Sequence, residues 1–174
     1  MRAHGGLKPQ DVVLLLKMFL WEDRSWRLID IAQDLGLSQG EISFALQRLK
    51  KSKLIDYNKK KPLIAPTLEF LIHGVKYMFP VDPGHIERGI PTSHSAPPLA
   101  KKIVSEKNDQ YVWASAEGKM RGQVIEPLYS EVPFAVMKDP KLHELLALVD
   151  ALRVGKARER NLAASELQKR MEAS

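Results

Sequence analysis

The sequence predicts a mainly α-helical fold with one small β-hairpin, followed by a C-terminal extension. Apolar residues recur every three or four positions in several segments, which is the period of a single helix face. Two short apolar runs flank the basic residues 58–61, a pattern typical of a hairpin. At 174 residues, the chain is long enough for one domain with a full core or for two small ones.

The first predicted helix covers residues 10–21 and has Pro9 in its first turn, where proline is well tolerated. Its apolar residues lie on nearly every side: Val12, Val13, Leu14, Leu15, Leu16, Met18, Phe19 and Leu20. A helix of this kind must be buried over most of its surface. We expect it to pack beneath the next two helices and to make a second contact, for which a dimer partner is one candidate.

Residues 28–55 predict two short helices joined by a tight turn. Gly36 can adopt the left-handed conformation that ends a helix. Ser38 can cap the next helix, and Glu41 completes a capping box. The apolar stripes are Ile29, Ile31, Ala32 and Leu35 in the first helix, and Ile42, Ala45, Leu46 and Leu49 in the second. Together these features predict a helix-turn-helix.

A hairpin is predicted directly after the second helix. Residues 54–57 and 62–65 are interpreted as its apolar strands, and residues 58–61 as its polar, basic turn. A further helix is expected to begin at Pro66 or at Thr67 as its N-cap, and to run to Phe79.

Helix, turn, helix and basic hairpin together resemble the winged helix-turn-helix domain of bacterial transcription regulators, in particular the MarR-like group. The closest motif runs from Ile42 to Lys50 and is followed by residues 53–55, where those families carry a Gly-Leu-Ile or Gly-Leu-Val strand start. Lys53 departs from the pattern, because glycine is usual there. The resemblance covers about residues 7–79 and implies a DNA-binding domain.

In such a domain the outward face of the second helix enters the major groove of DNA. Gln47 is suited to an adenine edge, Arg48 or Lys51 to guanine or phosphate, and Ser43 to phosphate. Phe44 could contact a thymine methyl group or pack on the hairpin. The expected DNA-binding residues are Ser38, Gln39, Gly40, Ser43, Phe44, Gln47, Arg48, Lys51, Lys59, Lys60 and Lys61.

Lysines gather at the end of this helix and in the hairpin turn: Lys50, Lys51, Lys53, Lys59, Lys60 and Lys61. A run of lysines is usually only a solvated surface. Here it stands where winged helices meet the DNA backbone, and phosphate neutralisation would give affinity that depends steeply on salt. The formal net charge of +6 also favours an anionic partner.

Residues 80–138 begin with a run rich in proline and glycine, which predicts an ordered strap or a linker. Residues 110–114 and 123–129 are interpreted as a possible β-hairpin, with an irregular arm as the alternative. His85, Glu87 and His94, with the serines beside His94, lack the third partner that a metal site or a nucleophilic serine needs. We therefore predict neither a metal nor another cofactor.

Residues 139–174 predict two helices. Asp139 is a good N-cap, Pro140 suits the first turn, and Gly155 can end the first helix. This helix carries an apolar stripe, and the helix that begins near Lys156 is amphipathic with a small apolar face. We expect both to form a dimer interface or to contact a partner protein.

These observations predict a sequence-specific regulator of transcription that binds double-stranded DNA and acts as a homodimeric repressor. The alternative is an antitoxin-like protein whose C-terminal region binds a partner protein while its winged helix represses its own operon. The sequence holds no phosphate-binding loop, paired catalytic carboxylates or nucleophile motif, so we do not expect an enzyme.

The sequence contains no cysteine, which excludes disulfides, thiolate catalysis and cysteine-ligated zinc. Residues 1–10 have no apolar core of the kind found in signal peptides. The longest apolar run, residues 12–21, is interrupted by Lys17 and is shorter than the roughly 20 residues that a membrane span needs. We therefore expect a cytoplasmic protein with no membrane association.

Overall fold

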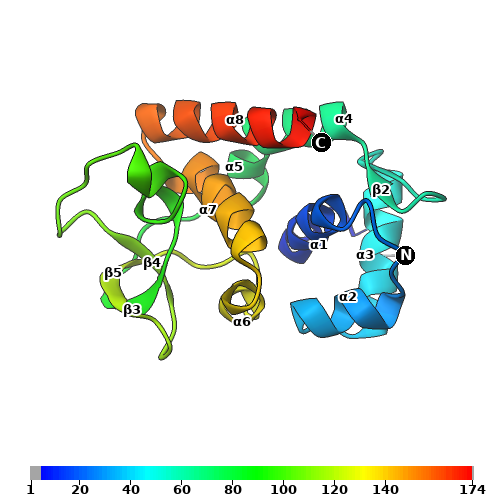
Figure 1. The fold of residues 1–174 in the computed structure, drawn as a ribbon, viewed down its shortest axis with the longest axis horizontal. Helices are drawn as coiled ribbons and strands as arrows, with labels where there is room; N and C mark the ends of the chain where they lie inside the picture. Colours follow the sequence, from blue (N-terminus) through cyan, green and yellow to red (C-terminus); the bar gives the residue numbers. More distant parts are fainter. Residues whose placement is uncertain (1–4, 174) are drawn as a thin grey trace.

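A computed structural model describes residues 5–173, and it confirms a mainly α-helical fold with two small sheets (Figure 1). The elements in order are α1 (Pro9–Leu20), α2 (Leu28–Leu35), α3 (Gln39–Lys51), β1 (Ile55–Asp56), β2 (Lys61–Pro62), α4 (Ile64–His73), α5 (Val75–Met78), β3 (Ile86–Pro91), η1 (Ser93–Ser95), η2 (Leu99–Lys101), β4 (Tyr111–Ala114), β5 (Met120–Val124), α6 (Val132–Met137), α7 (Pro140–Val154) and α8 (Ala157–Glu172), where η1 and η2 are 3₁₀ turns. No described helix is long and apolar enough to cross a bilayer.

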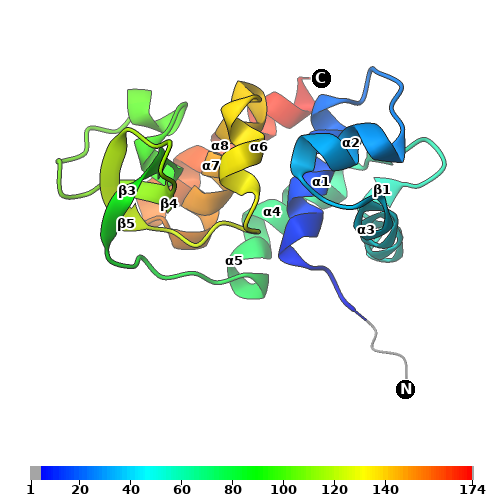
Figure 2. The same cartoon turned by 90° about the horizontal axis from the view of Figure 1, so that it is seen from below.

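Helix α7 lies in the middle of the molecule, between its two halves. In Figure 1, α7 lies between α1–α3 on one side and the strands β3, β4 and β5 on the other, while α8 runs across the top. Figure 2 shows the same order from below. One continuous hydrophobic core includes residues from Val12 in α1 to Met171 in α8. The regions 7–79, 80–138 and 139–173 therefore share a core, and Ser174 lies outside the described residues.

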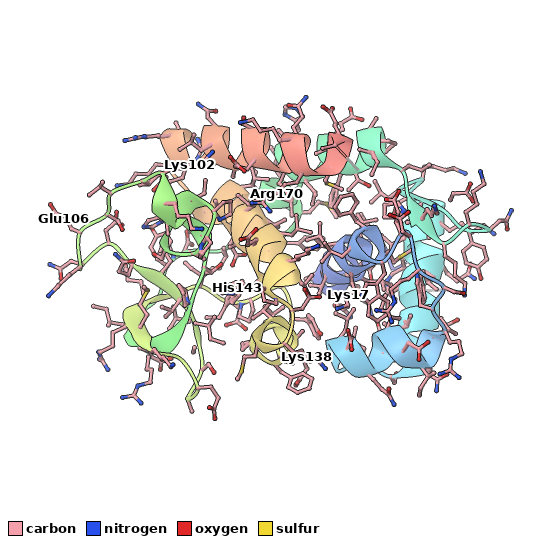
Figure 3. The ribbon with its side chains drawn as sticks, viewed as in Figure 1. Lys17, Lys102, Glu106, Lys138, His143 and Arg170 are labelled. Carbon is pink, nitrogen blue, oxygen red and sulfur yellow. The ribbon has the colours of Figure 1, made fainter. Side chains whose placement is uncertain are left out.

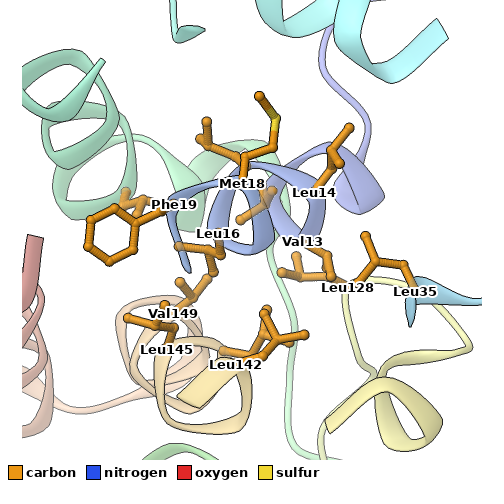
Figure 4. Close-up of a cluster of buried hydrophobic side chains, with 14 of the residues drawn as sticks. Val13, Leu14, Leu16, Met18, Phe19, Leu35, Leu128, Leu142, Leu145 and Val149 are labelled. Atoms are coloured by element: carbon orange, nitrogen blue, oxygen red, sulfur yellow. The ribbon is translucent and has the colours of Figure 1, made fainter. Parts of the chain in front are cut away.

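The second contact expected of α1 is made by α7 of the same chain. In Figure 4, Val13 and Leu16 of α1 lie beside Leu142 and Leu145 of α7, and all four side chains are almost completely buried. A second subunit therefore cannot reach the apolar stripe of α7. The small apolar face of α8 is also covered, because residues such as Leu167 are buried in the same core.

The second sheet has a topology that differs from the expected hairpin. β3 pairs antiparallel with both β4 and β5, and β4 and β5 are parallel, so the three strands close a small barrel. The prediction of a hairpin between residues 110–114 and 123–129 is therefore wrong. Their shared partner β3 lies in the segment interpreted as a strap or linker. The strands can approach closely because of glycine: a Cβ atom on Gly89 would lie 2.0 Å from the carbonyl oxygen of Trp113.

A buried carboxylate attaches this barrel to α7. Asp150 accepts hydrogen bonds at Oδ2 from Thr92 Oγ1 at 2.7 Å and from Trp113 Nε1 at 2.7 Å. Its Oδ1 accepts from Arg153 Nη1 at 2.8 Å. Burial raises the pKa of Asp150, while the arginine and the hydrogen bonds oppose that rise. With these three partners the carboxylate joins β4, the turn before η1 and α7.

A buried lysine joins three helices in the other half of the molecule. Lys17 Nζ of α1 lies 2.8 Å from Asp34 Oδ2 of α2 and 2.6 Å from Asp139 Oδ2, which precedes α7. Figure 3 shows Lys17 between these elements. Asp139 also caps α7 as predicted, because its Oδ1 accepts from the backbone N–H of Leu142 at 3.0 Å. Lys17, which interrupts the apolar run of α1, therefore forms ion pairs inside the protein.

We expect Asp139→Ala to lower the free energy of unfolding by about 2 kcal/mol, because it removes both a helix cap and a partner of a buried ammonium group. Asp139→Asn should cost roughly half as much, about 1 kcal/mol, since its amide oxygen can still cap α7. Urea denaturation followed by circular dichroism measures both. Equal losses in the two variants would show that the cap contributes nothing.

Candidate nucleic-acid interface

The turn between α2 and α3 has the predicted local structure. Gly36 adopts the left-handed conformation, with φ of 67°, and Ser38 Oγ accepts from the backbone N–H of Glu41 at 3.0 Å. The prediction that Glu41 completes a capping box is wrong. The Glu41 carboxylate instead accepts from Gln10 Nε2 at 3.1 Å and from Arg48 Nη2 at 2.7 Å. Because Gln10 belongs to α1, its bond to Glu41 holds α3 against α1, whereas the bond from Arg48 lies within α3.

Residues far along the chain hold the same turn from outside. The hydroxyl of Tyr129 donates to the carbonyl oxygen of Leu35, at the end of α2. Burial raises the pKa of Tyr129, which keeps this hydroxyl a donor. The side chain of Glu131 packs over Gly36, where an added Cβ atom would lie 3.2 Å from Glu131 Cγ. The segment before α6 therefore contacts both the end of α2 and the glycine of the turn.

The end of α3 is a Schellman motif that has lysine in the usual glycine position. The backbone N–H of Leu54 donates to the carbonyl of Leu49 at 3.1 Å, and that of Lys53 donates to Lys50 at 3.1 Å. Lys53 is left-handed, with φ of 61°. Lys53, where the resemblance led us to expect glycine, thus adopts a backbone conformation that favours glycine.

The predicted hairpin is present, but its strands are shorter than expected. β1 and β2 are antiparallel, with Ile55 opposite Pro62 and Asp56 opposite Lys61. The helix that follows begins at Ile64, so the prediction of a start at Pro66 or Thr67 is wrong. The backbone N–H of Thr67 already donates to the carbonyl of Leu63 at 3.0 Å, and this bond belongs to the first turn of α4.

One face of α3 is uncovered. Figures 1 and 2 both show this helix at the outer edge of the molecule, away from the barrel. The ring of Phe44 is 65% exposed and lines a shallow groove with Lys8 and Gln47. The alternative in which Phe44 packs on the hairpin is therefore wrong. The predicted residues that are exposed on this side are Ser38, Gln39, Gly40, Ser43, Phe44, Gln47 and Lys51.

Arg48 lies on α3 as expected, but its guanidinium group turns toward α1. Its Nε and Nη2 donate to the two oxygens of Asp11, at 2.7 and 2.8 Å, and the Asp11 side chain is completely buried. The hydrogen bond to Asp11 is the main cause that raises the pKa of Arg48, and Arg48 in turn lowers the pKa of Glu41. This bidentate pair gives Arg48 a structural role in place of the expected contact with guanine or phosphate.

Aromatic rings position two of the lysines near the hairpin. Lys50 Nζ lies 4.6 Å from the centre of the Tyr57 ring, and Lys60 Nζ lies 4.8 Å from that of Trp26. Lys59 is exposed at the hairpin tip and Lys61 is half-buried in β2. Neither Tyr57, which is exposed, nor Trp26, which is buried beneath Lys60, was among the expected DNA-binding residues. The sequence did contain one signal for these contacts, an aromatic residue next to basic ones: Tyr57 directly precedes residues 58–61, and Trp26 directly precedes Arg27.

The hydroxyl of Tyr57 joins the hairpin to the exposed face of α3. Gln47 Nε2 donates to this hydroxyl at 3.1 Å. The structure thus brings Gln47, Phe44 and the lysines of the hairpin to one side of the molecule. This side combines an apolar ring, an amide and several ammonium groups, which can contact base edges and phosphates. Among the described residues, no three or more histidine or acidic side chains gather as metal ligands.

Replacing Arg48 with methionine should lower the free energy of unfolding by about 3 kcal/mol, because the Asp11 carboxylate would stay buried without its counter-charge. The double variant Asp11→Asn/Arg48→Met should recover part of this loss, since a neutral amide is less costly to bury. Urea denaturation of the single and double variants checks the coupling. Strictly additive losses would contradict it.

Lys53→Gly should raise the free energy of unfolding by about 0.5–1 kcal/mol. Glycine removes the steric cost of a left-handed residue, and the greater freedom of the unfolded chain offsets part of that gain. Lys53→Ala is the matched control, because it removes the same charge and keeps the Cβ atom. Thermal unfolding should distinguish the two, and an equal gain in the alanine variant would assign the effect to charge.

No family model, curated protein or solved structure matches this chain. A functional assignment therefore rests on the geometry of α3, the β1–β2 hairpin and the residues that they expose.

Proposed function

We propose that this protein is a sequence-specific regulator of transcription that binds double-stranded DNA through a winged helix-turn-helix. In this proposal α3 enters the major groove and the β1–β2 hairpin lies along the neighbouring phosphate backbone. The observation that carries the proposal is the exposed ring of Phe44, beside Gln47, on a face of α3 that the described chain leaves uncovered. The major groove is wide enough to admit a helix and offers thymine methyl groups to such a ring.

The charge around this face supports the same proposal. Lys51 lies at the end of α3, and Lys59, Lys60 and Lys61 lie in the hairpin. These ammonium groups flank the proposed reading face, where a bound duplex would present its phosphates. The contact of Lys60 with the ring of Trp26 restricts that side chain before binding, so less entropy is lost when it meets a phosphate.

The support beneath α3 suits a reading helix, because base recognition needs side chains held in fixed positions. Arg48 and Asp11 hold α3 on α1, and Tyr129 holds the preceding turn. A homodimeric repressor would need a subunit contact other than the apolar stripe of α7, which is buried within the chain. The antitoxin-like alternative has less support, because the C-terminal region that would bind a partner protein already packs into the core of its own chain.

The variant Lys59→Ala/Lys60→Ala/Lys61→Ala should weaken binding to all duplexes alike. Each lost phosphate contact lowers the slope of log affinity against log salt by about 0.9, so we expect a decrease of about 2–3. Fluorescence anisotropy with labelled duplexes, over about 50–200 mM salt, measures both quantities.

The matched control is Lys101→Ala/Lys107→Ala/Lys119→Ala, which removes the same charge from exposed positions on the barrel side. Figure 3 marks Glu106, next to Lys107, at the end of the molecule away from α3. This control should keep the salt slope of the unaltered protein. Equal slopes for the two triple variants would contradict the assignment of the hairpin to the DNA backbone.

A further inference from the structure

We propose that Tyr57 is a positioning residue that orients Gln47 to read adenine in the major groove. This inference rests on the proposed DNA-binding function and adds to it the residue that orients Gln47 toward the adenine edge expected from the sequence.

The hydrogen bond between Gln47 and Tyr57 spans two elements. Gln47 lies on the exposed face of α3, and Tyr57 follows β1 in the hairpin turn. Gln47 Nε2 donates to Tyr57 Oη at 3.1 Å. An exposed glutamine on a helix otherwise samples many rotamers. A contact with the hairpin selects one of them before any DNA is bound, which reduces the entropy lost on binding.

The atoms of Gln47 that remain available match one base. Its amide has two N–H groups and one carbonyl oxygen, and the tyrosine hydroxyl uses one N–H. When Tyr57 takes the N–H that points away from the carbonyl oxygen, the other N–H and the oxygen form an adjacent donor and acceptor. Adenine offers N7 as an acceptor and its 6-amino group as a donor at the major-groove edge, whereas guanine offers two acceptors there. The remaining pair is therefore complementary to adenine.

The ring of Tyr57 is held independently of its hydroxyl. Lys50 Nζ lies 4.6 Å from the ring centre, and the Tyr57 carbonyl accepts from the backbone N–H of Lys60 at 3.3 Å. Asp56 Oδ1 tightens the same turn by accepting from the N–H of Lys59 at 3.1 Å. Tyr57→Phe therefore removes the contact with Gln47 while it retains the ring, the lysine above it and the turn.

The test begins with duplexes selected from a randomised pool by the unaltered protein. At the position read by Gln47, exchange of A·T for G·C should weaken binding by about tenfold or more. Substitution of 7-deazaadenine, which lacks the N7 acceptor, should also weaken it. In Tyr57→Phe the preference for adenine should fall to about threefold or less, because the amide is no longer held. Its affinity for random duplexes and its salt slope should stay unchanged.

Two further variants sharpen this test. Tyr77→Phe is the matched control, because Tyr77 is 75% exposed on α5 with Lys76 Nζ 5.0 Å from its ring centre. It should keep the full preference for adenine. Tyr57→Phe in a Gln47→Ala background should cause no further loss of preference, since Tyr57 acts through Gln47. Thermal unfolding of each variant confirms that the fold is retained.

The outcomes separate this inference from the function on which it rests. If the unaltered protein binds no duplex in a salt-sensitive manner, both are overturned. If it selects a site and Tyr57→Phe keeps the full preference for adenine, only the inference is overturned. If Tyr57→Phe weakens all duplexes alike and flattens the salt slope, Tyr57 acts on the DNA backbone and the positioning role is again overturned.

Discussion

The burial of α1 on all of its sides determines how the rest of the chain is arranged. Residues 12–16 are almost completely buried, so no side of this helix can face water. α3 packs on α1 from one direction and α7 from another, with the β1–β2 hairpin also in contact. Because apolar surface is stabilised by removal from water, the N-terminal and C-terminal parts of the sequence become one core around this helix.

The polar groups inside this core explain why its helices keep a single arrangement. Asp11, Lys17 and Asp150 are all almost completely buried, and each is paired with a group on another element. A buried charge is costly unless its partners stay within hydrogen-bond distance, so a shift of one helix would leave a charge unpaired. Such pairs contribute more to the uniqueness of the packing than to its net stability. The pair of Asp11 with Arg48 in particular holds α3 on α1.

Local sequence patterns predicted most helices and the turn before α3, because apolar spacing and capping residues act within a few positions of the chain. The same patterns could not assign β3, whose partners β4 and β5 lie about twenty or more residues away in the sequence. They also placed Arg48 on the proposed reading face. The helical period gives the side of a helix on which a residue lies, but the buried carboxylate of Asp11 decides where a long guanidinium side chain turns.

The sequence by itself determined the local conformations: the left-handed Gly36, the caps at Ser38 and Asp139, and the exposed positions of Phe44 and Gln47 on α3. Only the tertiary structure decided which apolar faces meet within one chain, and which polar groups are used internally. The bond from Gln47 to Tyr57 belongs to this second kind. Its two residues meet because the chain reverses direction between α3 and the hairpin, and their distance depends on packing that no single segment encodes.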